Sequence, residues 1–585
     1  MKGYNKIKIT LLFILFIFSI NSFSQFSKTH YIPPIGTQGQ GSGTPQIQYM
    51  YISTPNENPI DVIITPIGGD PITVSISNSN PYEYFIGNGN QTNFIALSEN
   101  SGQTFNNKGF IVEGEDLVYV SARLFTSDAY YQAAGLVSKG LAALGTTFRV
   151  GTFENLGNDM SNSFLNFVTV LATEDNTTVN FSDFGNGFTL VNNAPINDVI
   201  LNSGESYLIA IKPGDNINNS DALIGVLVES DKPIAVNSGS ITGSNANTTT
   251  DSNGQDAGID QIVPVERIGT EYIFVRGIGP DQIERPLIVA HEPNTEVYVN
   301  GTLEYTIAQA GEHWSVPSSF YGVSYDQYGQ GPDIGVSSNM YVETSKPVFA
   351  YQVIGGIRPG TEGPFGAGTG IPNQGLFFVP PINCQTPSIV NNIAAINKLG
   401  PDFAFGGVVT IVTETGSTVL INGNDISDFA GDVQPVNGNP LFETYTVEGL
   451  TGNVSIVSSS QVYVASFGAY DYATFGGYYS GFAYQPEIVL EEITVGSEGC
   501  IPNLELRLNS ISIFDQYQWY FNGEMIDGAI GNSFTPTEPG YYQISGAVDD
   551  CEGILLSDNI PVSACPPDTD FDGVNDNIDI DIDND

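Results

Sequence analysis

"FVTVLATEDNTTVNFS" (167–182) consists of two apolar, alternating runs on either side of a polar turn, and the same pattern occurs three more times. The other copies are "YMYISTPNENPIDVIIT" (49–65), "LIVAHEPNTEVYVNG" (287–301) and "VTIVTETGSTVLING" (409–423). Alternating β-branched and aromatic residues around a turn of Thr, Glu, Asn, Pro or Gly predict a β-hairpin. The sequence therefore predicts one β unit repeated four times.

The copies are evenly spaced, because Thr54, Thr173, His291 and Thr413 follow one another at ~120 residues. Other pieces recur in phase, such as "SDKPIAV" (230–236) and "SKPVFAY" (345–351). No long period of 3.6 residues is present, so we predict an all-β fold. The predicted units are 26–143, 144–267, 268–398 and 399–490.

A length of ~120 residues suits a sandwich of seven or eight strands. Four such units in tandem would form a row of sandwiches. A closed, propeller-like ring also gives strands at a fixed period, so periodicity leaves both arrangements open.

The pattern changes near residue 491, and residues 491–565 predict an immunoglobulin-like sandwich. Trp519 lies on an alternating strand where it should face the core, and "PGYY" (539–542) is typical of a tyrosine corner. We predict a disulfide between Cys500 and Cys551. Cys384 and Cys565 then either pair with each other or leave one free thiol.

The N-terminus predicts export. Three lysines precede the apolar run "ITLLFILFIFSI" (9–20), and "NSFSQ" (21–25) supplies small residues, as in a secretory signal peptide over residues 1–25. No later apolar run is long enough to span a bilayer. The formal net charge is -47, which makes nucleic acid and anionic lipid poor partners.

The chain ends on "DTDFDGVNDNIDIDIDND" (568–585). Alternate aspartates around a glycine turn supply the hard oxygens that Ca²⁺ prefers. The predicted calcium ligands are Asp568, Asp570, Asp572, Val574 (through its carbonyl), Asp576 and Asp579. The segment 566–585 resembles the start of thrombospondin type 3 repeats, which implies calcium as the cofactor. A disordered acidic linker is the alternative.

Three segments place aromatic or basic residues among flexible ones, and loops on rigid sandwiches often bind ligands. The ligand-binding candidates are Tyr325, Tyr328, Arg358, Tyr470, Tyr472, Tyr478 and Tyr479. The structural alternative is that these side chains pack between units.

No motif for catalysis is present: the chain has no HExxH, no GxSxG and no P-loop. Its three histidines, His30, His291 and His313, are far apart in the sequence. We therefore expect no enzymatic activity.

The segments "ATEDNTTVNF" (172–181), "GESYLIAI" (204–211) and "SDKPIAVNSG" (230–239) resemble the N-terminal domain of IgGFc-binding proteins. The whole arrangement is similar to that of bacterial surface proteins exported by type IX secretion, in which a C-terminal sorting domain follows. The resemblance implies an extracellular binding or adhesive role on the outer face of the outer membrane, and a chain that continues beyond Asp585.

The leading expectation is thus a secreted or cell-surface binding protein for a glycan, a glycoprotein or a protein partner. The alternatives are a structural spacer for a further C-terminal domain and an enzyme that acts on polysaccharides.

Overall fold

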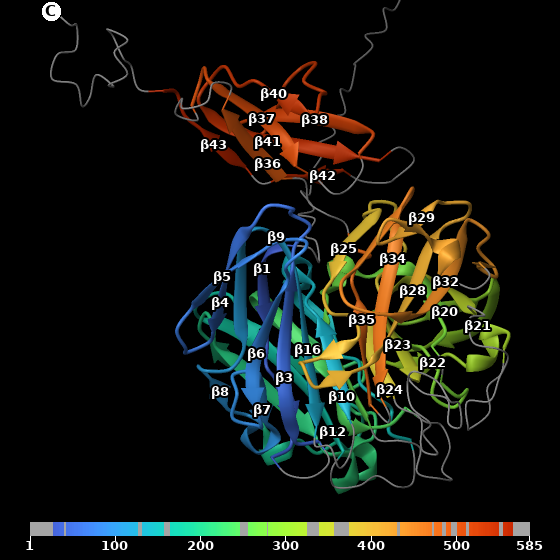
Figure 1. Cartoon of the computed structure of the whole chain (residues 1–585). Coiled ribbons are helices and arrows are strands. Elements are labelled where there is room, and N and C mark those ends of the chain that lie inside the picture. The colour runs from blue at the N-terminus through green and yellow to red at the C-terminus, as the bar shows by residue number, and fades with distance from the viewer. Residues whose placement is uncertain are drawn as a thin grey trace, which may run out of the picture. The chain divides into compact units, whose positions relative to one another are not determined.

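The computed structural model describes residues 27–39, 43–126, 132–156, 164–245, 256–277, 279–323, 338–355, 374–429, 433–470, 473–482, 487–492, 500–509, 514–548, 554–557 and 559–565. They form two compact units, mainly residues 23–484 and mainly residues 485–585. The all-β prediction is confirmed, since the described residues contain strands and short 3-10 helices but no α-helix (Figure 1). The 3-10 helices are η1 (Ser98–Asn100), η2 (Gly140–Ala143), η3 (Val191–Asn193), η4 (Pro213–Asp215), η5 (Ile217–Asn219), η6 (Val265–Arg267), η7 (Ser318–Tyr321) and η8 (Ile426–Asp428).

The first sheet has the order β5-β4-β9-β3-β6, with β1 and β10 also paired to β9. Its strands are β1 (Ser27–Ile32), β3 (Pro45–Ser53), β4 (Ile60–Pro66), β5 (Ile72–Ile76), β6 (Tyr82–Asn88), β9 (Phe110–Thr126) and β10 (Ala133–Val137). The strands β2 (Ile35–Thr37) and β7 (Ile95–Leu97) of the same unit form a separate, small parallel sheet.

The second sheet has the order β14-β13-β16-β12-β15-β8, with β11 and β17 also paired to β16. Its strands are β8 (Thr104–Phe105), β11 (Gly145–Arg149), β12 (Leu165–Ala172), β13 (Thr177–Ser182), β14 (Val199–Leu201), β15 (Ser206–Ile211), β16 (Leu227–Gly243) and β17 (Asp256–Ile262). The third sheet has the order β21-β20-β23-β19-β22, with β18 and β24 paired to β23. Its strands are β18 (Gly269–Val275), β19 (Leu287–Ala290), β20 (Thr295–Val299), β21 (Thr302–Ile307), β22 (His313–Ser315), β23 (Asn339–Gly355) and β24 (Gln374–Phe378).

The sheets of the fourth unit also include residues 389–398, which the predicted boundaries placed at the end of the third unit. They are two larger sheets, β25-β33-β29-β30 and β31-β32-β28-β34-β35, and the short pair β26-β27. Its strands are β25 (Ile389–Ile393), β26 (Lys398–Leu399), β27 (Phe403–Ala404), β28 (Gly406–Glu414), β29 (Val419–Ile421), β30 (Asn424–Asp425), β31 (Gln434–Pro435), β32 (Phe442–Leu450), β33 (Val454–Ser458), β34 (Val462–Tyr470) and β35 (Ala473–Tyr478).

The predicted hairpins are wrong in one respect, because the two strands of each repeat do not pair with each other. In the second unit β12 pairs with Ile234–Ile241 of the long strand β16, whereas β13 pairs with Leu227–Ser230 of the same strand. All of β12 is buried, and β13 is buried only at alternate residues. The turn therefore leads the chain from one layer of a curled sheet to the other. The alternation of apolar and polar residues is the same for such a connection and for a hairpin, so the sequence does not distinguish them.

The threonine at the repeat's matching point holds the bend of the long strand. Thr54 Oγ1 donates to the Leu117 carbonyl at 2.9 Å, and Thr173 Oγ1 donates to the Pro233 carbonyl at 2.6 Å. In the fourth unit Thr413 Oγ1 donates to the Gln461 carbonyl at 2.9 Å. His291 stands at this position in the third unit. Three of the four copies thus carry a threonine whose hydroxyl bonds to the long strand of its own unit.

Thr54→Val should lower the free energy of unfolding by roughly 1–2 kcal/mol, because valine keeps the shape but leaves the buried Leu117 carbonyl without its donor. Thr54 is 0% exposed. The measurement is the denaturant midpoint, with the exposed Thr302→Val as the matched control, which should change little. Equal midpoints for the two variants would refute the role given to Thr54.

The four units close into a ring. Each of four large buried clusters draws its residues mainly from two neighbouring units: the first with the second, the second with the third, the third with the fourth, and the fourth with the first. The strands β10, β17, β24 and β35, which we call the inner strands, also contact one another in cyclic order. In this order β35 is followed by β10 (Figure 1). Of the two arrangements that the sequence left open, residues 27–482 therefore adopt the closed ring built from curled sheets.

The other compact unit contains two sheets, β36-β37-β40 and β39-β38-β41-β42, with β43 paired to β41. Its strands are β36 (Glu487–Glu492), β37 (Leu504–Asn509), β38 (Gln516–Phe521), β39 (Glu524–Met525), β40 (Ser533–Phe534), β41 (Gly540–Ala547), β42 (Leu555–Leu556) and β43 (Ile560–Val562). Trp519 is 0% exposed in the core, as its alternating strand predicts. The Tyr542 hydroxyl donates to the Glu538 carbonyl at 2.8 Å, which ties β41 to the residues before it.

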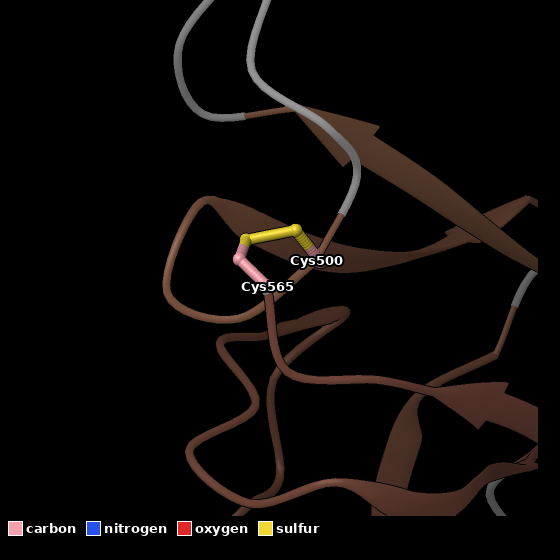
Figure 2. Close-up of a disulfide and its surroundings, with 2 residues drawn as sticks. All are labelled: Cys500 and Cys565. Carbon is pink, nitrogen blue, oxygen red and sulfur yellow. A yellow bond between two sulfur atoms is a disulfide. The ribbon is translucent and has the colours of Figure 1, made fainter. Parts of the chain in front are cut away.

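The predicted disulfide between Cys500 and Cys551 is wrong. Figure 2 shows that Cys500 is bonded to Cys565, which lies 65 residues later, with a Cα–Cα distance of 5.0 Å. The reason is the arrangement of the chain ends of this unit: Ile501 forms a parallel bridge with Ala564, which brings residues 500 and 565 together. Cys384 is disulfide-bonded as well. Because Cys565 is bonded to Cys500, the alternative pair of Cys384 with Cys565 is excluded too.

Candidate functional site

The inner strands run in the same direction and in register. Asp256 Oδ1 accepts the Ala133 N–H of β10 at 3.3 Å, and its Oδ2 accepts the Gln374 N–H of β24 at 3.1 Å. Four residues later, Asp260 accepts the N–H groups of Val137 and Phe378 at 3.4 and 2.9 Å. The first residues of the inner strands therefore lie at one end of the ring, which we call the entry end.

Small residues let the inner strands approach. A Cβ on Gly258 would lie 2.7 Å from the Leu376 Cβ, and one on Gly477 would lie 2.6 Å from the Val137 Cγ2. Real Cβ atoms do not come this close, so neither position accepts a side chain without movement. With so little room, the axis holds few side chains, and the polar ones come mainly from β17.

Among the described residues, Asp256 is held by backbone N–H groups. Its carboxylate accepts N–H groups from Ala257, Gln374, Ala133 and Thr474, so it reaches all three of the other inner strands. Burial raises the pKa of this carboxyl well above its usual value, and the four backbone donors act in the opposite direction. Because its oxygens already accept these bonds, Asp256 is a structural tie rather than a metal ligand.

A second carboxylate on the axis has a cationic partner. Lys139 Nζ lies 2.9 Å from Asp260 Oδ2, and the two side chains are 0% and 1% exposed. Lys139, Asp256 and Asp260 together form what we call the axial cluster. It joins all four units, because Asp256 of the second unit accepts N–H groups from the other three.

Amides and hydroxyls occupy the entry end. Gln374 Nε2 donates to Ser244 Oγ at 3.0 Å, and Gln374 Oε1 accepts the Asn245 N–H at 2.6 Å. Thr242 Oγ1 donates to Gln132 Oε1 at 3.1 Å. These polar contacts join the first three units just before their inner strands begin. Buried amides and hydroxyls therefore hold the entry end together.

Two of the sequence-predicted ligand residues are buried, and their assignment to ligand binding is wrong. Tyr478 and Tyr479 are 2% and 5% exposed. Tyr478 packs edge-on against Phe377 at 5.7 Å, and Tyr479 lies 6.2 Å from Tyr119 between the fourth and first units. Both follow from the position of β35 inside the ring, where neither face of the strand meets solvent.

The remaining candidates lie at or beyond the limits of the described residues. Tyr325, Tyr328, Arg358 and Tyr472 are outside the described residues, and Tyr470 is the last residue of β34. The segment that carries Arg358 begins after Gly355 and finishes before Gln374. Likewise, the segment that carries Tyr472 begins after Tyr470 and finishes before Ala473. Both segments thus start and finish where β24 and β35 begin, at the entry end.

The predicted calcium ligands between Asp568 and Asp579 also lie outside the described residues. Among the residues that are described, no three His, Cys, Asp or Glu side chains converge as a metal site. In the same residues, no helix has the length and apolarity needed to cross a membrane.

Sequence reasoning missed the buried charged residues that close the ring. Arg123, Lys139, Asp256 and Asp260 are all at most 2% exposed. One signal was present in the sequence. The segment "DAGIDQI" (256–262) places two acids in a run that otherwise has the composition of a β-strand. Buried acids are rare, so such a run indicates a structural or functional carboxylate. Nothing in the sequence pairs Lys139 with Asp260.

A buried histidine lies beside the axial cluster. His30 is 0% exposed, and its Nε2 donates to the Val118 carbonyl at 2.9 Å. Its Nδ1 lies 2.9 Å from Ser138 Oγ, next to Lys139 in the chain. Burial lowers the pKa of His30 to about 4.

This pKa predicts a pH dependence of stability. The folded state keeps His30 neutral, whereas the unfolded chain takes up a proton below its ordinary pKa of 6.5. The stabilisation is fully present above pH 6.5 and is lost as the pH falls towards 4, by roughly 3 kcal/mol. Denaturation at pH 7.5 and 4.5 should therefore show a smaller loss in His30→Gln than in the original chain. Equal losses in both proteins would contradict this prediction.

Comparison with known proteins gives one family match. The model of the family described as "IgGFc binding protein" matches residues 134–468, which is more than half of the chain. No curated protein matches the chain.

Two solved structures were compared as well. Immunoglobulin domains 1–5 of Sidekick-1 are 8% identical, with 92% of this chain and 100% of that chain covered and a TM-score of 0.10. A mutant Salmonella alpha-2-macroglobulin is 8% identical, with 94% of this chain and 47% of that chain covered and a TM-score of 0.12. At these TM-scores neither structure bears on the fold.

The matched residues include the inner strands β10, β17 and β24, both acids of the axial cluster and most of the fourth unit. The match begins after Arg123 and stops before β35, so it covers three of the four inner strands and both acids of the axial cluster. The chain belongs to the IgGFc-binding protein family.

Proposed function

We propose that this chain is a secreted or cell-surface binding protein that recognises glycoproteins at the entry end of its ring. The observation that carries the proposal is that the four connections before the inner strands start and finish there. Loops held by a rigid scaffold are the usual place for binding residues. Arg358 and Tyr472 belong to two of these connections.

The family supports a binding role rather than an enzymatic one, and we propose that the chain is not an enzyme. We further propose that residues 1–25 are a signal peptide and that the protein is displayed on the bacterial surface after type IX secretion. Residues 491–565 would serve as an immunoglobulin-like module. The spacer role is less favoured, because a closed ring of four units is a compact body rather than a row of sandwiches.

A glycan and mucin array, probed with residues 26–585, tests the proposal. Saturable binding to one glycan class, weakened at least tenfold by Arg358→Ala with Tyr472→Ala, is expected. Tyr541→Ala is the matched control, since Tyr541 is 56% exposed in the other compact unit. An array without signal from folded protein would reject glycoprotein recognition. Turnover of a polysaccharide would reject the non-enzymatic role.

We also propose that calcium binds the tail through Asp568, Asp570, Asp572, Val574, Asp576 and Asp579. Calorimetric titration of residues 26–585 should give a dissociation constant on the order of 10⁻⁴–10⁻³ M, typical of extracellular calcium modules. Asp570→Asn with Asp572→Asn should remove the heat. Titration without heat in the original chain would contradict the proposal, and heat that survives in the variant would place calcium elsewhere.

A further inference from the structure

Lys139 and Asp260 are held together away from water. Lys139 Nζ lies 3.0 Å from Asp260 Oδ1 and 2.9 Å from Oδ2, and it also donates to the Val137 carbonyl at 2.9 Å. The exposed fractions of the two side chains are 0% and 1%. Removing two charges from water is expensive, and neutral groups of similar volume are often as stable in such places. Burial therefore reduces the cost of a state in which both charges are neutralised.

Burial acts on both groups in that direction. It lowers the pKa of the Lys139 ammonium and raises the pKa of the Asp260 carboxyl, while the attraction between the two charges opposes both changes. A proton transfer along the existing hydrogen bond converts the ion pair into an amine and a carboxylic acid. These are the two reactants of amide formation.

Backbone donors hold the carboxyl group for attack. The Phe378 N–H donates to Asp260 Oδ2 at 2.9 Å, and the Gln261 N–H donates to Oδ1 at 2.9 Å. Fixed N–H groups at a carboxyl oxygen stabilise the negative charge that develops there when a nucleophile adds. Reactants held by a rigid fold also avoid the entropy of meeting in solution.

We propose that Lys139 and Asp260 condense into an isopeptide bond between the first and second units of the ring. Lys139 Nζ, as the neutral amine, moves out of the carboxyl plane and its lone pair forms a bond to Asp260 Cγ. The carbonyl electrons pass to the oxygen held by the Phe378 N–H. They then return as the C–OH bond breaks, and the hydroxyl leaves with a proton from Nζ as water. No oxidant, metal or co-reactant is consumed.

The bond would close a covalent link from the end of β10 to β17. The first and second units would then stay together even where the hydrogen bonds between β10 and β17 open. The inference is independent of the proposed function, since it concerns the ring and not its ligand.

Intact mass spectrometry of residues 26–585, with disulfides reduced and the chain denatured, tests the bond. The expected mass is lower than that of the sequence by one water. Digestion with trypsin should yield a branched peptide that contains residues 139 and 260, with no cleavage after Lys139. A full mass, with normal cleavage after Lys139, would overturn the proposal and leave an ordinary ion pair.

Variants distinguish the bond between Lys139 and Asp260 from a loss of water at other residues. Asp260→Asn should give the same branched peptide, because ammonia leaves in place of water. Lys139→Arg keeps the charge but should have the full mass. Lys108→Arg, at a half-buried lysine whose Nζ donates to the Thr92 carbonyl, should keep the loss of one water. If Lys139→Arg also loses water, the dehydration lies elsewhere and the proposal fails.

Discussion

Arg123→Met is expected to lower the free energy of unfolding of the ring by roughly 3–5 kcal/mol. Arg123 lies on β9 in the first unit, and its guanidinium donates to three carbonyls of the fourth. Nη1 reaches Ala395 O at 2.7 Å and Lys398 O at 2.8 Å, and Nη2 reaches Ala394 O at 2.9 Å. Methionine would leave all three carbonyls without this donor inside the junction.

The loss would come mainly from the guanidinium. Its carbon lies 4.1 Å from the Tyr51 ring centroid and 4.8 Å from that of Phe475, so two cation–π contacts disappear as well. Methionine keeps most of the apolar stem and its packing. The variant therefore measures the contribution of the guanidinium's polar contacts to closing the ring, because the volume of the side chain in the core changes little.

Chemical denaturation gives the size of the effect, and amide hydrogen exchange gives its place. Amides of β9 and β34 should lose protection, whereas those between β16 and β23 should change less. Arg507→Met is the control, because Arg507 is 53% exposed and its guanidinium lies 3.0 Å from the carboxylate of Glu505 on the same strand. A loss below about 1 kcal/mol, or exchange that rises evenly around the ring, would reject Arg123 as the closing residue.

Removal of the Cys500–Cys565 disulfide should destabilise the unit formed by residues 485–585 by about 4 kcal/mol. The bond closes a loop of 65 residues, and in the chain-entropy account a loop of this length restricts the unfolded chain by that amount. Cys565→Ser should therefore lower the thermal midpoint of this unit. The ring, which has its own cores, should keep its midpoint.

A peptide map under non-reducing conditions checks the pairing itself. It should contain a disulfide-linked peptide with Cys500 and Cys565. A linked peptide with Cys500 and Cys551 would restore the pairing expected from immunoglobulin-like spacing. Cys500→Ser serves as the matched variant and should shift the midpoint by the same amount as Cys565→Ser, since either change breaks one bond.

Local patterns in the sequence were sufficient for the β class, the repeat and the core position of Trp519. These features depend on neighbours along one strand or within one unit. Alternation marks which residues face a core, and in three of the four repeats a threonine bonds to the long strand of its own unit. Thr54, Thr173 and Thr413 were visible for that reason.

Only the tertiary structure decided which strands pair, how the cysteines are joined and which aromatic residues are buried. β12 and β13 read as a hairpin, yet each pairs with a different half of β16. The sequence predicted that Tyr478 and Tyr479 are exposed among glycines, yet both are buried because β35 is an inner strand. In both cases the partner lies far away in the sequence.

The ring is the clearest example of this division. A period of ~120 residues is the same for a row of sandwiches and for a closed circle. Closure depends on contacts such as that of Arg123 with the Lys398 carbonyl and of Lys139 with Asp260, which join residues more than a hundred positions apart. The sequence by itself determined the unit, because its pattern is local. The tertiary structure decided the assembly, because a buried charge is tolerated only where folding brings its partner.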